Sequence, residues 1–473
     1  MLAKDKKYDL VIVGSGLSGS AAAAQAGLNG IKTLVLEKGH TTGGTGNYVE
    51  GVFAVGSKLQ KKRGVKLTQK YILDEERNWT HALANMAVWR NYVAQAADNI
   101  DWLEENGVKI TQMRTLGTGD DTWHLFDGHG KTAINEGLLP TAKKNGVEVI
   151  TSAQAIRLTV DNSGKIQGLI IKDLDTDKEQ FIEAKNIIIA TGGYLNNEKM
   201  LNSNSNHNGN RIIPVNSGKN NGDGLKLAWS IGAKHFGMGT VMMFGGQVYD
   251  PTVPGYKNWM RQSNRAATYE AELWVNEKGD RFANEDCTDI WAIAGNTLIR
   301  QEKVYAILDQ KQIDELSEHS FKGNYNYDHL KQDIEDDLND QKPYLTEADS
   351  IEALAKKLNL VNLPENIKRY NHLVAEKEDT DFNKEAKYLH AIEKDPFYAF
   401  ELGIGAFCTM GGLRTDVKNR VLDNNGDAIP GLYAVGTDGS ACLVGDTYGV
   451  NVPGSEAGYC IYSGRNAVEN LIK

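Results

Sequence analysis

The sequence has few cysteines, four among 473 residues, at Cys287, Cys408, Cys442 and Cys460. No two of them have the CxxC spacing of zinc, iron–sulfur or c-type haem sites, so we expect no metal centre. Scattered cysteines of this kind are typical of reduced thiols in a cytoplasmic protein. Any cofactor chemistry is therefore expected to come from a bound organic molecule.

Long apolar runs and an excess of positive charge are also missing. No apolar stretch approaches the ~20 residues that a membrane-spanning helix needs. The formal net charge of −10 disfavours nucleic acids and anionic membrane surfaces as partners. The chain passes from Lys4, Lys6 and Lys7 directly into an apolar run, which predicts no cleavable signal and a cytoplasmic location.

The most informative stretch lies at residues 8–39. Leu10–Val13 is apolar and β-branched, as expected for a strand that is buried on both faces. The strand ends at the sequence GSGLSG (14–19), which fits G-x-G-x-x-G, and an alanine-rich helix is predicted over 20–28. A second apolar strand is predicted over 33–36. This order of strand, glycine turn, helix and strand is typical of a dinucleotide-binding unit.

The glycines of this motif have separate physical roles. Gly14 allows a tight turn, Gly16 lets the backbone approach a pyrophosphate, and Gly19 lets the helix pack closely on the strand. The free N–H groups at the helix start favour a doubly negative ligand. Glu37 lies 37 − 19 = 18 residues beyond Gly19. An acid is expected at about 20 residues to bind a ribose hydroxyl. The unit predicts a dinucleotide site without separating FAD from NAD.

The rest of the chain contains two parts with different sequence patterns, and 473 residues are enough for two domains. Leu73–Asn106 is predicted to be largely helical, because apolar residues recur at three- and four-residue steps. Segments 155–160, 166–172 and 179–184 predict a small antiparallel sheet, followed by a separate buried strand at Asn186–Ala190. From about Lys234 to Lys394 the strand–glycine–helix pattern is missing, which predicts an inserted domain.

Several motifs together resemble the flavoprotein subunit of the fumarate reductase and succinate dehydrogenase family. They are VIVGSGLSG with LEKG, GGTGNYVEG, DGHGK, IIIATGGY, GDGLKLA, VNEKGDRFANE, CTMGG and GLYAVGTDGS. The resemblance covers nearly the whole chain and is closest to soluble flavocytochrome c fumarate reductases without their haem domain. Urocanate reductases, 3-ketosteroid dehydrogenases and vinyl phenol reductases are related members. It implies an α/β fold with a Rossmann-like FAD-binding domain at 1–235 and 400–473 and an inserted α+β capping (substrate) domain at 236–399.

The resemblance implies FAD as the cofactor. Covalent members of the family carry the flavin on a histidine where this chain has Gly44, so we expect non-covalent FAD. By position, the pyrophosphate would be held by Gly14, Ser15, Gly16 and Gly19, the ribose by Glu37, the adenine by the backbone of Ala155, and the rest of the cofactor by Lys38, Gly43, Gly44, Thr45, Gly46, Thr191, Gly192, Asp223, Gly436 and Thr437. Thr437 departs from the acid of the family's Gly-Glu pair.

The residues with which fumarate reductases handle a dicarboxylate are replaced. Asp289 stands where the family has its proton-donating arginine, and Arg265 aligns roughly with a member of the proton relay. Phe407 replaces a histidine next to Cys408, and Asn451 aligns near an arginine that clamps a carboxylate. Since bidentate arginines fit carboxylates, their loss argues against a dicarboxylate substrate.

Two residues are candidates for proton transfer to the substrate. Tyr448 lies in a region where the ketosteroid branch uses tyrosines, and the alternative is an ordinary turn tyrosine. Asp289 is either a general acid or base or the cap of a helix that starts after it. Arg265 has the alternative of a solvated residue. Aromatic and methionine residues at 236–259 are either the core of the capping domain or the roof of an apolar pocket.

Three functions remain open. The first is an FAD-dependent ene-reductase that transfers hydride from flavin N5 to an activated C=C bond, such as that of a vinylphenol or an uncharged enone. The second is a ketosteroid-type dehydrogenase of an apolar ketone, and the third is a non-catalytic flavoprotein electron carrier. We favour the first, with a small-molecule alkene as substrate. The electron donor, whether NADH, reduced flavin or a separate reductase, is not specified by the sequence.

Overall fold

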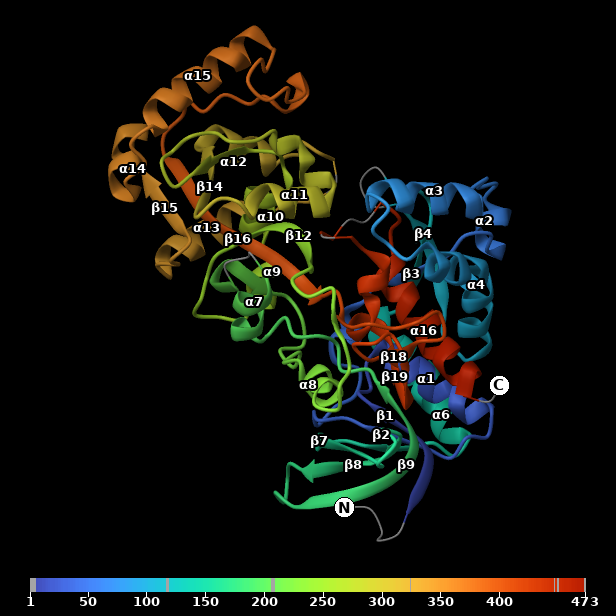
Figure 1. Cartoon of the computed structure of the whole chain (residues 1–473). Coiled ribbons are helices and arrows are strands. Elements are labelled where there is room, and N and C mark those ends of the chain that lie inside the picture. The colour runs from blue at the N-terminus through green and yellow to red at the C-terminus, as the bar shows by residue number, and fades with distance from the viewer. Residues whose placement is uncertain are drawn as a thin grey trace. The chain divides into compact units, whose positions relative to one another are not determined.

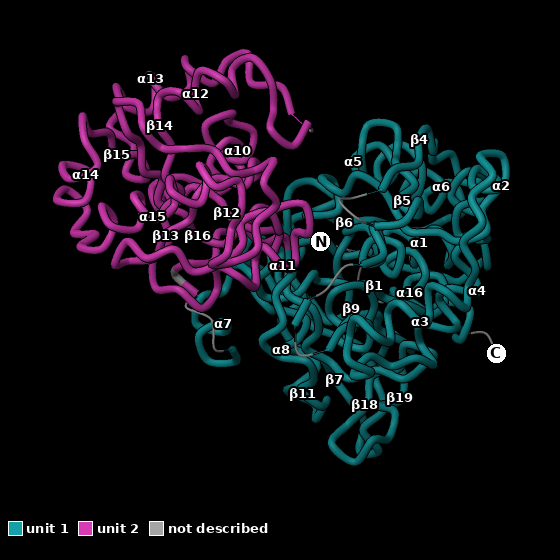
Figure 2. Tube along the Cα trace, turned by 90° about the horizontal axis from the view of Figure 1, so that it is seen from above, with its two compact units in different colours: residues 1–206, 216–242, 408–473 teal, residues 207–215, 243–407 magenta. Residues whose placement is uncertain are grey.

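The computed structural model describes residues 6–115, 119–205, 209–323, 325–445, 447–448 and 451–471. The polypeptide forms two compact units, and Figures 1 and 2 show their course. The first unit comprises 1–206, 216–242 and 408–473, and the second comprises 207–215 and 243–407. The second unit thus begins and ends a few residues later than the predicted capping domain, and it also takes in a short earlier segment.

The first unit is built on a mainly parallel sheet (Figure 1). Five strands lie in parallel order, β19 (Ala428–Ala434), β9 (Glu179–Ile189), β1 (Lys7–Val13), β2 (Thr33–Leu36) and β6 (Glu148–Ile150). β2 is entirely buried, and β1 is buried along Leu10–Val13, as their apolar sequences predict. The α/β prediction for this unit is confirmed.

Three further strands extend this sheet in antiparallel fashion, β7 (Ala153–Val160), β8 (Ile166–Asp173) and β18 (Arg420–Leu422). The prediction of two strands between 179 and 190 is wrong, because β9 is continuous. Its first half pairs antiparallel with β8 and its second half pairs parallel with β1. No turn residue separates the halves, so one strand joins the small sheet to the central one.

The helix that follows the glycine motif packs against two other helices. α1 (Leu17–Leu28) packs against α16 (Ser455–Leu471) and against α6 (Leu139–Lys144). The approach of α16 to α1 is close, because a Cβ added at Gly464 would lie 2.5 Å from the carbonyl oxygen of Ser18. Side chains of α1 and α16 share one core cluster with β1 and β9, including Ile12, Ala22, Ile188 and Val468.

The predicted helical stretch 73–106 is two helices, α3 (Gln69–Trp79) and α4 (Met86–Glu105). The backbone leaves helical geometry between them, with positive φ at His81 and Ala82. Asn85 caps α4, since its side-chain oxygen accepts from the backbone N–H groups of Ala87 and Val88. The prediction of a largely helical stretch is therefore confirmed, and the link between the two helices is its main non-helical part.

The second unit is α+β, as predicted. Its long strand β16 (Phe397–Thr409) pairs antiparallel with β14 (Val304–Asp309) and β15 (Leu345–Ala348), and β14 pairs antiparallel with β13 (Leu273–Asn276). β12 (Val241–Val248) and β10 (Ile212–Pro214) complete the sheet. Helices α12 (Gln310–Leu316), α13 (Leu330–Asn339), α14 (Ile351–Leu358) and α15 (Leu363–Glu376) follow in the same unit.

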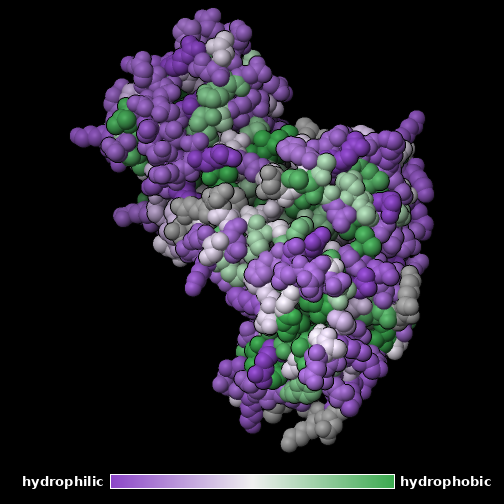
Figure 3. Space-filling model, viewed as in Figure 1, coloured by the Kyte–Doolittle hydropathy of each residue, from purple (hydrophilic) through white to green (hydrophobic). Residues whose placement is uncertain are grey.

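The surface is mostly hydrophilic on the face shown in Figure 3. Among the residues that the structure describes, no helix is long and apolar enough to cross a membrane. Within the same ranges, no group of three or more His, Cys, Asp and Glu side chains is placed to hold a metal ion.

Candidate functional site

The turn from β1 into α1 contains three motif glycines. The packing of the protein requires two of them to be glycine but leaves space for a side chain at the third. A Cβ at Gly14 would lie 2.2 Å from the Ala190 carbonyl oxygen, and one at Gly19 would lie 2.0 Å from the Gly14 carbonyl oxygen. A Cβ at Gly16 would meet nothing closer than an oxygen of Gly43 at 3.8 Å. The space at Gly16 is therefore left open by the protein, as a bound pyrophosphate requires.

Glu37 is buried directly beside this turn. Its Oε2 accepts from the Ser15 hydroxyl (2.7 Å) and backbone N–H (3.2 Å), and its Oε1 accepts from the Gly39 N–H (2.7 Å). A carboxylate has about four lone-pair sites, so these bonds leave acceptor capacity for a ribose hydroxyl. Gly16, the N-cap of α1, provides no capping side chain, which suits an anionic ligand at the first N–H groups of the helix.

A second glycine loop lies against the first. The Gly43 N–H donates to the Ser15 carbonyl oxygen (3.1 Å), and a 3₁₀ turn, η1 (Gly44–Tyr48), follows. A Cβ at Gly44 would meet only the Ser217 hydroxyl at 4.0 Å, whereas a Cβ at Gly46 would lie 2.7 Å from the Leu17 nitrogen. Gly46 is thus needed for packing on α1, and Gly44 faces open space.

Hydrogen bonds tie this loop to later segments. The Thr45 hydroxyl donates to the side-chain oxygen of Asn220 (2.9 Å). The side-chain NH₂ group of Asn220 donates in turn to the Gly192 carbonyl oxygen (2.7 Å). Lys38 forms an ion pair with Asp223 (2.6 Å), at the first turn of α8 (Asp223–Trp229). Residues predicted to line the cofactor are therefore brought together from distant parts of the sequence.

Asp438 organises the loop that follows β9, and the sequence analysis missed it. Its Oδ1 accepts from the Gly193 N–H (2.8 Å), and its Oδ2 accepts from the Gly192 N–H (3.1 Å) and from the Thr191 hydroxyl (3.0 Å) and N–H (2.5 Å). Burial raises the pKa of the Asp438 carboxyl, although these donors oppose the rise. Asp438 could have been found from the sequence, because it is an acid that directly follows the predicted cofactor residue Thr437.

The remaining predicted cofactor residues also lie in the first unit. Gly436 has positive φ, and its N–H donates to the Ser463 hydroxyl (3.0 Å). The Thr437 carbonyl accepts from the Gly411 N–H (2.8 Å). Ala155 is buried on β7. That these residues contact FAD stays a prediction.

Three predicted substrate-side residues belong to the first unit. Cys408 is buried and its thiol points at the Met242 sulfur (3.5 Å). The Asn451 amide donates to Glu75 of α3 (2.5 Å). Tyr448 is buried, and burial, with Cys408, Glu456 and Glu76 nearby, holds the pKa of its phenol well above the usual range. The Tyr448 phenol is therefore a weaker acid than an ordinary tyrosine, and it keeps its proton.

Asp289 lies in the second unit and is ion-paired. Its Oδ2 lies 2.8 Å from the Nζ of Lys322, whose side chain is 1% exposed and also donates to the Asp286 carbonyl (2.7 Å). The alternative of a helix cap is wrong, because Ile290 is the N-cap of α11 (Trp291–Leu298). Asp289 therefore accepts a hydrogen bond from the buried ammonium of Lys322.

Arg265 is half-buried on α10 (Gln262–Tyr269). Its guanidinium lies 5.3 Å from the ring centroid of Tyr325 and 3.2 Å from the Met260 sulfur. The neighbouring Arg261 pairs with the buried Asp337 (2.7 Å). Arg265 is therefore held by an aromatic face, and its catalytic role stays a prediction.

Phe407 belongs to an aromatic cluster in the second unit, formed by Phe244, Trp259, Trp291 and Phe407. The Phe244 ring lies 4.3 Å from Trp259 and 4.5 Å from Phe407 between centroids. Phe244 is buried, whereas the other three are half-buried. The predicted aromatic group at 236–259 is thus divided, because Phe236 belongs to the first unit and is exposed.

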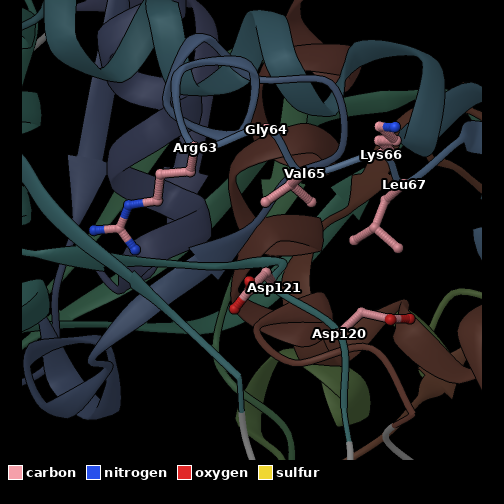
Figure 4. A pocket seen from close by; sticks show the side chains of 7 residues that line it. All are labelled: Arg63, Gly64, Val65, Lys66, Leu67, Asp120 and Asp121. Carbon is pink, nitrogen blue, oxygen red and sulfur yellow. The ribbon is translucent and has the colours of Figure 1, made fainter.

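A surface hollow of the first unit lies apart from these residues (Figure 4). It is lined by 63–67, which follow α2 (Lys58–Lys62), and by Asp120 and Asp121. None of its lining residues is a predicted cofactor, substrate or catalytic residue. It carries no part of the functional argument.

Comparison with known proteins supports the dinucleotide-binding interpretation of the glycine loops. A model of the FAD binding domain family matches residues 9–447. The chain is 42% identical to vinyl phenol reductase of Lactiplantibacillus plantarum over 476 residues, which cover 98% of this chain and 96% of that protein. It is 28% identical to NADH:fumarate oxidoreductase of Klebsiella pneumoniae, over 96% of this chain and 46% of that protein.

Solved structures share the fold. The open conformation of a flavocytochrome c3 fumarate reductase matches with a TM-score of 0.74 and 22% identity, over 100% of this chain and 80% of that one. The 3-ketosteroid Δ1-dehydrogenase of Sterolibacterium denitrificans matches with a TM-score of 0.81 and 18% identity, over 98% of this chain and 99% of that one. Fold and family model together define a flavoprotein oxidoreductase that carries an FAD-binding domain. The chain belongs to the FAD-binding fumarate reductase and succinate dehydrogenase flavoprotein family, which confirms the resemblance.

Proposed function

We propose that this protein is an FAD-dependent ene-reductase that saturates the vinyl double bond of a vinylphenol. The observation that carries the proposal is the 42% identity to a vinyl phenol reductase along nearly the full length of both proteins. The replacement of carboxylate-binding cations by Asp289, Phe407 and Asn451 supports it, because a vinylphenol has no carboxylate to bind.

The first unit is proposed to hold FAD and the second to act as the capping domain. The open space at Gly16, the uncapped start of α1 and the spare acceptor capacity of Glu37 fit a dinucleotide. When bound, the flavin supplies a hydride donor and acceptor at N5. Because Gly44 offers no side chain for a covalent link, we propose non-covalent FAD. Acid denaturation should release all the flavin into the supernatant, and flavin that stays on the polypeptide would contradict this.

The aromatic cluster of the second unit supports an aromatic substrate. Trp259, Trp291 and Phe407 are half-buried, so part of each ring remains available for contact. Aromatic pairs add about 0.5–1.5 kcal/mol beyond area burial. A dicarboxylate would gain nothing comparable from such rings.

The proposed reaction needs one proton donor and one proton acceptor. Protonation of the terminal vinyl carbon while the phenol loses its proton gives a quinone methide, which accepts hydride at the benzylic carbon. Tyr448, a neutral buried phenol, is proposed as the donor, and Asp289, paired with Lys322, as the acceptor. Each role is proposed from the environment of the residue within its own unit.

The partner is proposed to be a small-molecule alkene, and a cytoplasmic location is proposed from the cysteine content. The reaction is tested by reducing the enzyme anaerobically with dithionite and following flavin absorbance after addition of 4-vinylphenol, an uncharged enone or fumarate. Reoxidation by 4-vinylphenol with formation of 4-ethylphenol is expected. Reoxidation by fumarate alone would contradict the proposal, and reoxidation by none of the alkenes would favour an electron carrier.

A further inference from the structure

One loop of the second unit contacts both residues of that unit for which the sequence predicts a catalytic role. Its Lys322 pairs with Asp289 (2.8 Å), and the ring centroid of its Tyr325 lies 5.3 Å from the guanidinium of Arg265. Asp289 and Arg265 are therefore both held by side chains of the same short segment. This segment, the Lys322 loop, follows α12, and its described residues are 320–323 and 325–327.

The Lys322 loop is anchored on Glu270, a fully buried residue that caps the end of α10. The Oε1 of Glu270 accepts from the hydroxyl groups of Ser320 (2.7 Å) and Tyr327 (2.7 Å). Its Oε2 accepts from the backbone N–H of Lys322 (3.0 Å). Three donors of one loop thus converge on a single buried side chain, and a buried donor is costly to leave unpaired. The backbone of Lys322 is therefore fixed by a residue outside the loop.

The ammonium of Lys322 is enclosed, whereas the carboxyl group that it contacts is not. The side chain of Lys322 is 1% exposed, and that of Asp289 is 33% exposed. The ammonium also donates to the Asp286 carbonyl (2.7 Å) and lies 4.4 Å from the ring centroid of Tyr388. An enclosed ammonium cannot contact a ligand. Lys322 can therefore act on a bound substrate only through Asp289.

Lys384, a second buried lysine of the same unit, provides an internal contrast. Its side chain and that of Glu285, 3.3 Å away, are both fully buried, and Arg281 pairs with the same Glu285 (2.8 Å). Both members of that ion pair are enclosed, as expected for a group that holds the interior of the unit together. The pair of Lys322 differs, because its acidic member is partly exposed. Since an apolar side chain often replaces a buried ion pair without loss of stability, the ammonium of Lys322 is better explained by its effect on Asp289.

We propose that Lys322 is the positioning residue of the proton acceptor Asp289, and that Glu270 in turn positions Lys322. This inference rests on the proposed function. In the proposed reaction, the O–H bond of the substrate phenol breaks and its proton passes to Asp289, while Tyr448 protonates the terminal vinyl carbon. Lys322 holds the Asp289 carboxyl group in one orientation for this step. A proton acceptor must lie within hydrogen-bond reach of the proton that it takes, so a displaced carboxyl group slows the reaction.

The first test replaces Lys322 in the full-length, FAD-loaded enzyme. Lys322→Met removes the donor and keeps an unbranched side chain. The rate of flavin reoxidation at saturating 4-vinylphenol should fall by about 10²-fold, as for a reacting group displaced by about 1 Å. The half-saturating concentration should stay within about twofold of wild type, because the lost interaction acts on the transition state rather than on binding. Glu270→Gln keeps one acceptor oxygen for the loop, so the rate should fall by only about tenfold.

Lys384→Met is the matched control. It also removes a buried ammonium, while Glu285 keeps its bond with Arg281. Its melting temperature should fall, but its reoxidation rate should stay within about twofold of wild type, because the pair lies outside the proposed proton transfer. Circular dichroism and FAD content verify that each variant is folded and loaded. The same loss of rate in Lys384→Met as in Lys322→Met would overturn the inference.

A double-mutant cycle separates positioning from a merely structural role. Asp289→Asn removes the proton acceptor, so adding Lys322→Met to it should lower the rate by less than about twofold more. Independent effects that multiply, or an unchanged rate in Lys322→Met alone, would overturn the inference. If Lys322→Met does not fold, Glu270→Gln enters the same cycle with the same expectation. Wild-type enzyme that does not reduce 4-vinylphenol at all would refute the proposed function itself, and the inference with it.

Discussion

The predicted cofactor loops of the first unit and the predicted substrate-side residues of the second unit are held by different kinds of contact. In the loops, backbone N–H groups converge on two buried carboxylates, Glu37 and Asp438. At these residues of the second unit, side chains contact side chains, as in the ion pair of Asp289 with Lys322 and in the rings around Phe244. A backbone N–H donor is present whatever the residue type, whereas a contact between two side chains is lost when either residue is replaced.

The largest effect is expected where the backbone must approach the cofactor. Gly16→Val should fold but purify without FAD, because its side chain enters space that only a ligand would fill. Gly14→Val is the contrasting variant and should fail to fold, because its Cβ would lie 2.2 Å from the Ala190 carbonyl oxygen. The ratio of FAD to protein, with circular dichroism as the folding control, checks both. Full FAD occupancy in Gly16→Val would refute the pyrophosphate assignment.

The next effect concerns the proton donor. Tyr448→Phe removes the hydroxyl and keeps the ring, so FAD binding should persist while first-turnover reoxidation by 4-vinylphenol falls by about 10²-fold or more. Stopped-flow absorbance of the flavin measures it. A rate close to wild type would mean that Tyr448 is an ordinary buried tyrosine.

A smaller effect is expected at the carboxylate that holds the loop after β9. Asp438→Asn presents an NH₂ group to donors that now face a carboxylate oxygen. Each buried N–H left unsatisfied costs about 1–3 kcal/mol. The free energy of unfolding and the affinity for FAD should both fall, which denaturant titration and flavin binding measure. Unaltered stability would show that the loop does not depend on Asp438.

The smallest effect is a change in how stability depends on pH. The pKa of Glu456 rises from its ordinary 4.5 to about 8 on folding, so the folded protein binds more protons between these values. The free energy of unfolding contributed by this group is therefore present below about pH 4.5 and is lost as pH rises through about 8. Glu456→Gln should melt higher than wild type at pH 8.5 to 9 (roughly one unit above the pKa). An equal or lower melting temperature there would contradict a protonated Glu456.

The same comparison explains what the sequence could predict. The strand, glycine turn and helix at the N-terminus follow from backbone rules, so the sequence predicts β1, α1 and β2. The ion pair of Asp289 with Lys322 joins residues 33 positions apart, on no common motif, and only the fold brings them together. The break between α3 and α4 had a readable signal, the capping residue Asn85, which the apolar periodicity obscured.

The central claim is that the phenol of the substrate drives the reduction, and one comparison tests it most directly. Pre-reduced enzyme is mixed in a stopped-flow instrument with 4-vinylphenol or with its O-methyl ether, 4-methoxystyrene. The ether cannot lose a phenolic proton, so no quinone methide can form. Rapid flavin reoxidation by 4-vinylphenol and none by the ether is the predicted result, whereas equal rates with both alkenes would contradict the account.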